Sequence, residues 1–80
     1  MGYKIEYHKA AEKYLDNQPL GTKKRIKSAI ENLPDGDVKK MTGREGYRLM
    51  VGGFRILFIY LNNTTIEVVA IGPRGDIYKK

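Results

Sequence analysis

Three arginines and one tyrosine are the residues of this sequence best suited to chemistry. Arg48, Arg55 and Arg74 lie within or just beyond runs of apolar residues, and Tyr78 follows close behind. A guanidinium group offers planar, multidentate donors that match phosphate, so several of them together would clamp a phosphodiester and stabilise a pentavalent phosphorane. Whether these side chains meet depends on the elements that carry them.

The first half of the chain predicts one strand and two helices. Alternating apolar and polar residues from Tyr3 to His8 indicate a half-buried strand. From Lys9 the apolar period becomes helical, and it is interrupted at Asn17-Gln18-Pro19. A second, amphipathic helix ends before Pro34. Its apolar residues recur at i, i+3, i+4 and i+7: Ile26, Ala29, Ile30 and Leu33.

The second half predicts a loop and three strands. The polar segment from Pro34 to Glu45 reads as a loop, and the strand-like runs behind it are Tyr47 to Val51, Phe54 to Leu61 and Thr65 to Ile71. Gly52-Gly53 and Asn62-Asn63 tolerate positive φ, which predicts two tight two-residue hairpins. The order β-α-α-β-β-β predicts an α+β fold, with a two-helix hairpin packed on one face of an antiparallel sheet. Residues 1–80 form a single domain.

Tight hairpins also fix which side chains share a face of the sheet. The face predicted to pack beneath the helices is apolar throughout: Tyr47, Leu49, Val51, Phe54, Ile56, Phe58, Tyr60, Val69 and Ile71. On the opposite face, Arg55 lies across from Met50 and Ala70, and the chain leaves Ala70 toward Arg74. We therefore expect the four candidates to converge at one end of the helix-free face as an anion site: Arg48, Arg55, Arg74 and Tyr78.

A structural reading of the same arginines stays open on this geometry. Arg48 would then be an ordinary solvent-facing strand residue. Arg55 would pair with a carboxylate such as Glu67 or Glu45, and Arg74 would be a turn residue.

An apolar strip is predicted at the other end of the helix-free face. Its residues are Leu57, Ile59, Ile66 and Val68. Exposed strips of this kind mark protein interfaces, and a groove on a sheet accepts an amphipathic helix. The strip predicts a protein partner, unless a helix or the first strand of this chain covers it.

Composition narrows the classes of function. Fifteen Lys and Arg against nine Asp and Glu give a net charge of +6, which favours polyanions or acidic proteins as partners. The basic loop residues Lys39, Lys40 and Arg44 are candidates for RNA contact, whereas the lysines of the second helix read as a solvated face. Without cysteine there is no disulfide framework, thiolate nucleophile or cysteine zinc cluster. We expect no metal, no cofactor, no membrane contact and a cytoplasmic location.

Two other titratable residues have ordinary explanations. His8 is the only histidine and the usual acid–base candidate, but it lies at a strand-to-helix junction, where a polar residue is common. Asp76 follows Gly75 and suits a turn better than a catalytic base.

Nearly the whole chain resembles one protein superfamily. The blocks "KKMTGREGYRLMVGGFRILFIY" (39–60), "IEVVAIG" (66–72) and "PRGDIYK" (73–79) look like the RelE/ParE toxins of type II toxin–antitoxin systems. The β-α-α-β-β-β order matches as well. The resemblance implies an antitoxin partner that contributes an amphipathic helix, in a heterodimer or a larger assembly.

The resemblance also implies an activity. RelE-like members cleave mRNA on the ribosome without a metal ion, through attack of the 2′-hydroxyl on the adjacent phosphate. ParE-like members act on DNA gyrase instead. On this chain the basic and tyrosine positions of the RNA-cleaving branch fall on the same four residues, Arg48, Arg55, Arg74 and Tyr78. We expect an endoribonuclease. A gyrase inhibitor, or a silent member that only pairs with its antitoxin, is the alternative.

Two positions depart from the family pattern. Met50 stands where the family usually has a second basic residue, and a thioether neither accepts a proton at neutral pH nor binds phosphate. Pro73 stands where relatives often have Lys or His. Both departures predict weakened activity.

Overall fold

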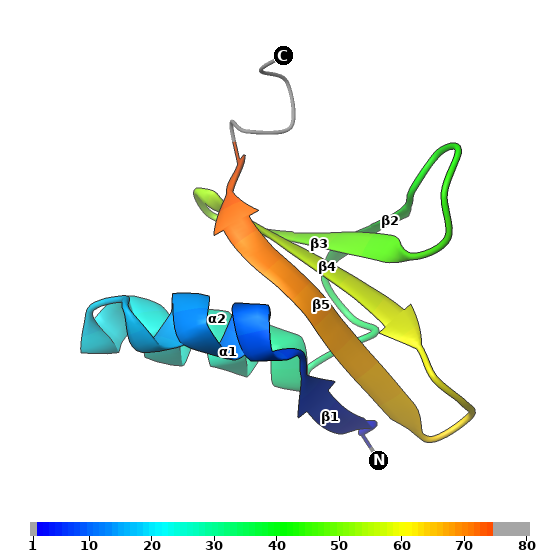
Figure 1. Cartoon of the computed structure of the whole chain (residues 1–80), viewed down its shortest axis with the longest axis horizontal. Helices are drawn as coiled ribbons and strands as arrows, with labels where there is room; N and C mark the ends of the chain where they lie inside the picture. The colour runs from blue at the N-terminus through cyan, green and yellow to red at the C-terminus, as the bar shows by residue number, and fades with distance from the viewer. Residues whose placement is uncertain (1, 75–80) are drawn as a thin grey trace.

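Two helices and five strands make up the part of the chain, residues 2–74, that the computed structural model describes. In chain order they are β1 (Lys4–Tyr7), α1 (Lys9–Asp16), α2 (Leu20–Glu31), β2 (Asp37–Lys40), β3 (Tyr47–Val51), β4 (Phe54–Tyr60) and β5 (Thr65–Pro73). The α+β class is confirmed, with both helices on one side of the sheet (Figure 1). Tyr78 and Asp76 lie outside the described residues.

The sheet has one strand more than the sequence predicted. Its order is β1-β5-β4-β3-β2, with β1 parallel to β5 and the other neighbours antiparallel. The predicted loop from Pro34 to Glu45 is wrong over Asp37–Lys40, which forms the edge strand β2. Only Val38 of this short segment is apolar, so no period of two was visible. The strand exists because it pairs with β3, placing Val38 opposite Leu49.

The helices begin and end close to where their sequences predict. His8 has extended backbone and its Nδ1 accepts a hydrogen bond from the Ala10 N–H at 3.3 Å, so it caps α1. The junction role predicted for His8 is confirmed. Pro19 precedes α2, where its fixed φ suits a helix start.

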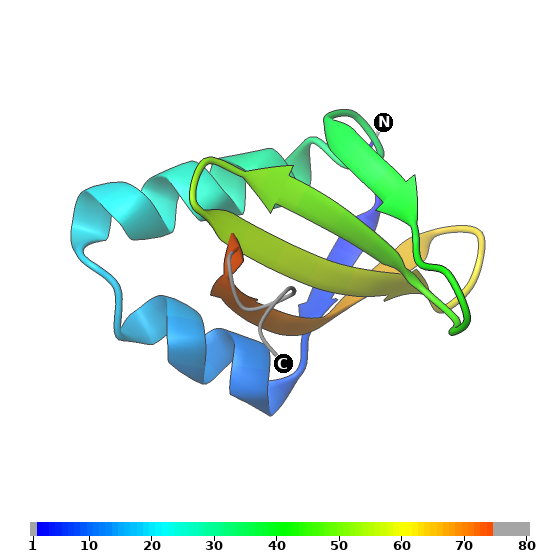
Figure 2. The same cartoon turned by 90° about the horizontal axis from the view of Figure 1, so that it is seen from above.

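A single core joins both helices to the sheet. Its buried residues are Ala11, Leu15, Ile26, Ile30, Leu33, Leu49, Ile56, Phe58, Ile66, Val68 and Ile71. They come from both helices and from the helix-facing side of β3, β4 and β5, and partly buried residues such as Tyr14 and Ala29 pack against them. In Figure 2 the two helices lie along one flank of the strongly twisted sheet. Within residues 2–74, no helix covers the opposite face of the sheet.

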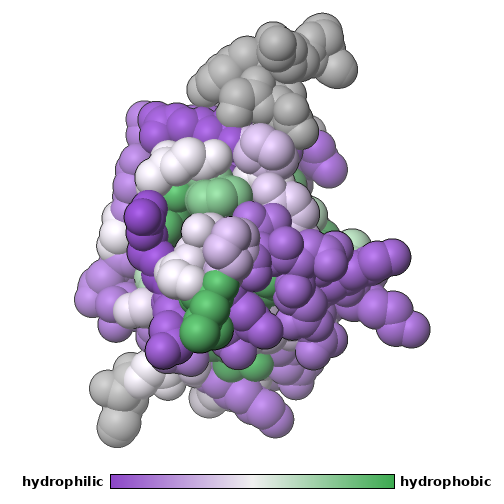
Figure 3. Space-filling view, turned by 90° about the vertical axis from the view of Figure 1, so that its left-hand side faces the viewer, coloured by the Kyte–Doolittle hydropathy of each residue, from purple (hydrophilic) through white to green (hydrophobic). Residues whose placement is uncertain are grey.

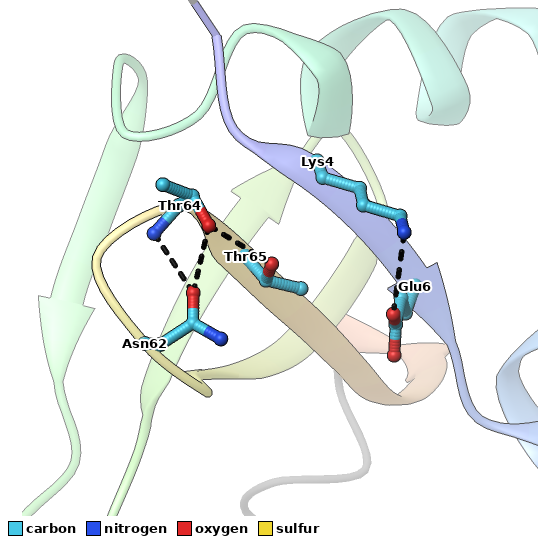
Figure 4. Close-up of polar contacts among 5 residues, drawn as sticks. All are labelled: Lys4, Glu6, Asn62, Thr64 and Thr65. Carbon is cyan, nitrogen blue, oxygen red and sulfur yellow. Dashed lines mark hydrogen bonds and ion pairs between the residues drawn. The ribbon is translucent and has the colours of Figure 1, made fainter.

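The connection from β4 to β5 differs from the predicted two-residue hairpin. It spans residues 61–64, and Asn62 Oδ1 accepts hydrogen bonds from the N–H and the hydroxyl of Thr64, both at 2.9 Å (Figure 4). The backbone N–H groups of Leu61 and Asn62 donate to the Thr65 carbonyl at 2.9 and 3.4 Å, so the connection closes one residue later than a two-residue turn would. The register accordingly places Tyr60 opposite Ile66.

A β-bulge between Leu57 and Phe58 then shifts the register a second time. Leu57 pairs with Ala70 whereas Phe58 pairs with Val68, which leaves Val69 as the extra residue. The predicted core position of Val69 is therefore wrong, and this side chain is half-buried. The predicted apolar strip is wrong for Ile66 and Val68, because both are 0% exposed in the core. Leu57 and Ile59 remain on the helix-free face, half-buried.

Candidate functional site

The helix-free face of the sheet, called here the arginine face, carries Arg48 and Arg55. The hairpin at Gly52-Gly53 is the predicted two-residue turn, with Val51 opposite Phe54 and φ of +55° at Gly52. Met50 lies opposite Arg55, as expected. Across the next strand, Arg55 pairs with Gly72 rather than Ala70. Gly72 and Ala70 are two positions apart on β5 and face the same side of the sheet. Arg55 therefore still lies on the predicted face, near the end of β5.

The unpredicted strand β2 adds a third cation to this face. Lys39 pairs directly with Arg48, so the two side chains are cross-strand neighbours on the arginine face. The adjacent Lys40 pairs with Tyr47 and points to the other side, where its Nζ lies 5.9 Å from the Tyr47 ring centroid. Arg44 is exposed in the connection between β2 and β3. Of the predicted RNA contacts, Lys39 thus lies beside the arginines and Lys40 does not.

Both arginines on the face have polar atoms without partners. Arg48 and Arg55 are half-buried, and the Nε atom of each is buried with no hydrogen-bond partner among the described residues. The ion pairs in residues 2–74 join Lys4 to Glu6 at 4.0 Å and Lys23 to Asp16 at 2.9 Å. The predicted alternative, in which Arg55 pairs with Glu67 or Glu45, is therefore absent from this part of the chain. A buried guanidinium donor without an acceptor favours an anionic ligand.

Arg74 is fixed at the same end of the sheet as Arg55. Its backbone N–H donates to the Gly53 carbonyl at 2.9 Å, which extends the β4–β5 ladder by one residue beyond Pro73. Its Nη1 donates to the Gly52 carbonyl at 3.2 Å. These bonds hold Arg74 against the β3–β4 turn. Its remaining guanidinium donors have no partner recorded within residues 2–74.

Met50 separates opposite charges on the arginine face. Asp37 of β2 pairs with it on one side and Arg55 of β4 on the other. The acidic neighbour was missed, because the segment that carries Asp37 was read as a loop. Only the pairing of β2 could have placed this carboxylate.

The described residues contain neither a metal-ligand cluster nor a membrane-spanning helix. No three histidine, aspartate or glutamate side chains within residues 2–74 come together as a cation would require. Neither α1 nor α2 has the length and apolarity needed to cross a bilayer.

Comparison with known proteins gives one family and one group of solved structures. The model described as "ParE toxin of type II toxin-antitoxin system, parDE" matches residues 5–78. The archaeal RelE–RelB complex from Pyrococcus horikoshii OT3 is 26% identical, with a TM-score of 0.73 over 94% of this chain and 98% of that chain. The RelB–RelE antitoxin–toxin complex from Methanococcus jannaschii is 33% identical, with a TM-score of 0.71 over 91% and 94%.

A third structure shares the fold at lower identity. The RelBE2 toxin–antitoxin complex from Mycobacterium tuberculosis is 16% identical, with a TM-score of 0.74 over 95% of each chain. Among curated proteins, none matches the sequence significantly.

Proposed function

The chain belongs to the ParE toxin family of type II toxin–antitoxin systems, within the RelE/ParE superfamily, and we propose that its arginine face cleaves RNA. The observation that carries the proposal is the pair of half-buried guanidinium groups, Arg48 and Arg55, whose buried Nε atoms lack partners among the described residues. Arg74 lies at the same end of the sheet and adds further donors. Such a set is suited to the extra charge of a pentavalent phosphate.

The proposed reaction needs only atoms of the RNA. The 2′-hydroxyl gives up its proton and its oxygen bonds to the adjacent phosphorus, which forms a 2′,3′-cyclic phosphate. The bond from that phosphorus to the 5′-oxygen of the next nucleotide breaks, and this oxygen takes up a proton and leaves as a 5′-hydroxyl. Arg55 and Arg74 hold the non-bridging oxygens, and Arg48 with Lys39 binds the strand beside them. Tyr78, outside the described residues, is the proposed group for proton transfer or base stacking. Arg44 and Lys40 are proposed to contact the RNA away from the reacting phosphate.

The proposed substrate is mRNA on the ribosome, and the proposed regulator is an antitoxin. Support for the antitoxin comes from the RelE–RelB structures, which are toxin–antitoxin complexes of a 26% and a 33% identical chain. Leu57 and Ile59, the two residues of the predicted apolar strip that lie on the arginine face, are the proposed contacts for its amphipathic helix. The net charge of +6 favours both an RNA substrate and an acidic protein partner.

A second candidate function is inhibition of DNA gyrase. The family model that matches residues 5–78 describes ParE toxins, and Met50 removes a charge that the RNA-cleaving branch usually has. A member that only pairs with its antitoxin would be a silent variant of either branch.

Primer extension on a reporter mRNA in a reconstituted translation reaction tests the proposed function. We expect discrete cuts that require ribosomes. Arg55→Ala and Arg74→Ala should each reduce cutting about 100- to 1,000-fold, the usual effect of removing one donor to a developing oxyanion. Lys9→Ala, exposed on α1, is the control for charge and should cut normally.

Two results would reject the RNase. Undiminished cutting by folded Arg55→Ala and Arg74→Ala would remove the arginines from the reaction. No cutting by the wild-type protein, together with trapped gyrase–DNA cleavage complexes, would establish the second candidate instead.

A further inference from the structure

A fourth arginine, from α2, reaches the turn that holds Arg74. Arg25 is exposed on the helix, and its Nη1 lies 3.1 Å from where a Cβ on Gly52 would be. The Arg25 guanidinium therefore lies close to Gly52, and a side chain at this position would require it to shift by a few tenths of an ångström. This cation lies beside the space that glycine leaves at the β3–β4 turn.

Arg74 approaches the same glycine from β5. Its Nη1 donates to the Gly52 carbonyl, so side chains from α2 and from the end of β5 meet at one residue of the turn. Figure 1 shows the β3–β4 turn beside the end of β5, with α2 on the helix side of the sheet. Viewed from the side of the α1–α2 connection, the surface is mainly hydrophilic, with small hydrophobic areas (Figure 3). Arg25 and Arg74 are both exposed, so the two arginines form an accessible, charged site.

Two guanidinium groups at one glycine repel each other unless an anion lies between or over them. Neither arginine forms an ion pair in residues 2–74, where the paired carboxylates are those of Glu6 and Asp16. The turn carries no carboxylate of its own, since Val51, Gly52, Gly53 and Phe54 are uncharged. Arg55, two residues beyond the turn, belongs to the arginine face. The pair at the turn therefore continues the cationic surface around the edge of the sheet toward α2.

We propose that Arg25, beside Arg74 at the β3–β4 turn, binds the RNA backbone phosphate next to the one that Arg55 and Arg74 hold, and so adds a second phosphate site to the arginine face. This inference rests on the proposed function, because it extends the path of the same RNA strand onto α2. The ligand is a phosphodiester of single-stranded RNA, contacted without regard to base. Arg25 is a substrate-binding residue that takes no part in the reaction.

The test compares Arg25→Gln with Lys24→Gln, which removes the same charge from a neighbouring exposed position of α2. The probe is an mRNA oligonucleotide made uncleavable by 2′-O-methyl groups, and its affinity is measured between 50 and 200 mM salt. One lost phosphate contact on a single strand lowers the salt slope by about 0.7. The affinity of Arg25→Gln should then fall about eightfold at 50 mM and about threefold at 200 mM, whereas Lys24→Gln should bind like wild type.

A second arm identifies the source of the phosphate. Binding of each variant to ribosomes without mRNA is measured under the same conditions. A loss confined to the oligonucleotide assigns the site to the message, and a loss confined to ribosomes assigns it to ribosomal RNA. Equal behaviour of Arg25→Gln and Lys24→Gln in both arms overturns the site. Arg25→Lys, which keeps the charge without the planar fork, should bind with intermediate affinity.

Failure of this inference can be told from failure of the proposed function. If the wild-type protein makes ribosome-dependent cuts and Arg25→Gln binds RNA as tightly as the wild type, only the second phosphate site is rejected. Binding that depends on Arg25 without any cutting would reject only the nuclease. Because Arg25 is exposed, all three variants should unfold at the wild-type temperature, which excludes a structural cause.

Discussion

At the scale of single residues, the positions of Arg48 and Arg55 followed from the nature of the Gly52-Gly53 turn. A two-residue hairpin fixes which residues of its two strands pair and share a face, so Arg55 could be placed opposite Met50 from the sequence. The residue of β5 that pairs with Arg55 could not be predicted, because it depends on the length of the connection from β4 to β5. Arg25 was also out of reach, since no sequence pattern places a helix residue against a turn 27 positions later.

A cation in place of Met50 is the substitution that we expect to increase the proposed RNA cleavage. Met50→Arg would place a guanidinium between Asp37 and Arg55 on the arginine face. The carboxylate of Asp37 should offset repulsion from Arg55, and the new donors would face the same phosphate. We expect mRNA cutting to increase about tenfold, the effect of one charge-assisted hydrogen bond.

Primer extension under the conditions used for the wild type measures the change. Met50→Leu keeps the volume without the charge and should cut at the wild-type rate. A Met50→Arg protein that folds and cuts no faster would show that the missing charge is not what weakens the site.

At the scale of elements, the two helices and the strands β1, β3 and β4 were readable because each has a full apolar period of its own. The edge strand β2 was not, because its four residues include a single apolar side chain. The two register shifts of β5 were also hidden. The side-chain turn at Asn62 reverses the faces of Ile66 and Val68, and the bulge at Val69 restores them before Ile71. The core gains both apolar residues, while Glu67 moves outward opposite Ile59.

The bulge predicts that adjacent valines differ in their contribution to stability. Val68 is 0% exposed beneath the helices, whereas Val69 is the half-buried extra residue. Val68→Ala should lower the free energy of unfolding by about 2 kcal/mol, from lost burial and the cavity left behind. Val69→Ala should lower it by less than about 1 kcal/mol.

Urea unfolding of both variants gives the comparison. The tight-hairpin register would place Val69 in the core and Val68 outside. A larger loss of unfolding free energy for Val69→Ala than for Val68→Ala would therefore support that register and contradict the bulge.

At the scale of the whole molecule, the sheet and the helices are joined in part at a half-buried tyrosine, Tyr7. Tyr7 of β1 points into the core side of the sheet, and Lys27 of α2 lies 5.7 Å from its ring centroid. Its hydroxyl is buried without a hydrogen-bond partner among the described residues. Burial raises the pKa of Tyr7 above its ordinary value of 10.0, and the nearby charge of Glu31 on α2 raises it further.

This shift makes the stability of the domain depend on pH in alkaline solution. Below pH 10, Tyr7 is neutral in both the folded and the unfolded chain, and its contribution is fully present. Above that pH the unfolded chain releases the proton while the folded chain retains it, so stability falls as pH rises. Tyr7→Phe has no proton to release and should lose less stability between pH 9 and 11 than the wild type.

The measurement is urea unfolding of the wild type and Tyr7→Phe between pH 9 and 11. The readout is the difference in their unfolding free energies, because the titration of lysines affects both proteins alike. Glu31→Gln removes the second cause of the shift and should flatten the wild-type curve only in part. At pH 7, Tyr7→Phe should be as stable as the wild type or slightly more stable, since it removes a buried hydroxyl that has no partner in residues 2–74. Parallel curves for wild type and Tyr7→Phe above pH 9 would mean that the hydroxyl reaches water in the folded chain.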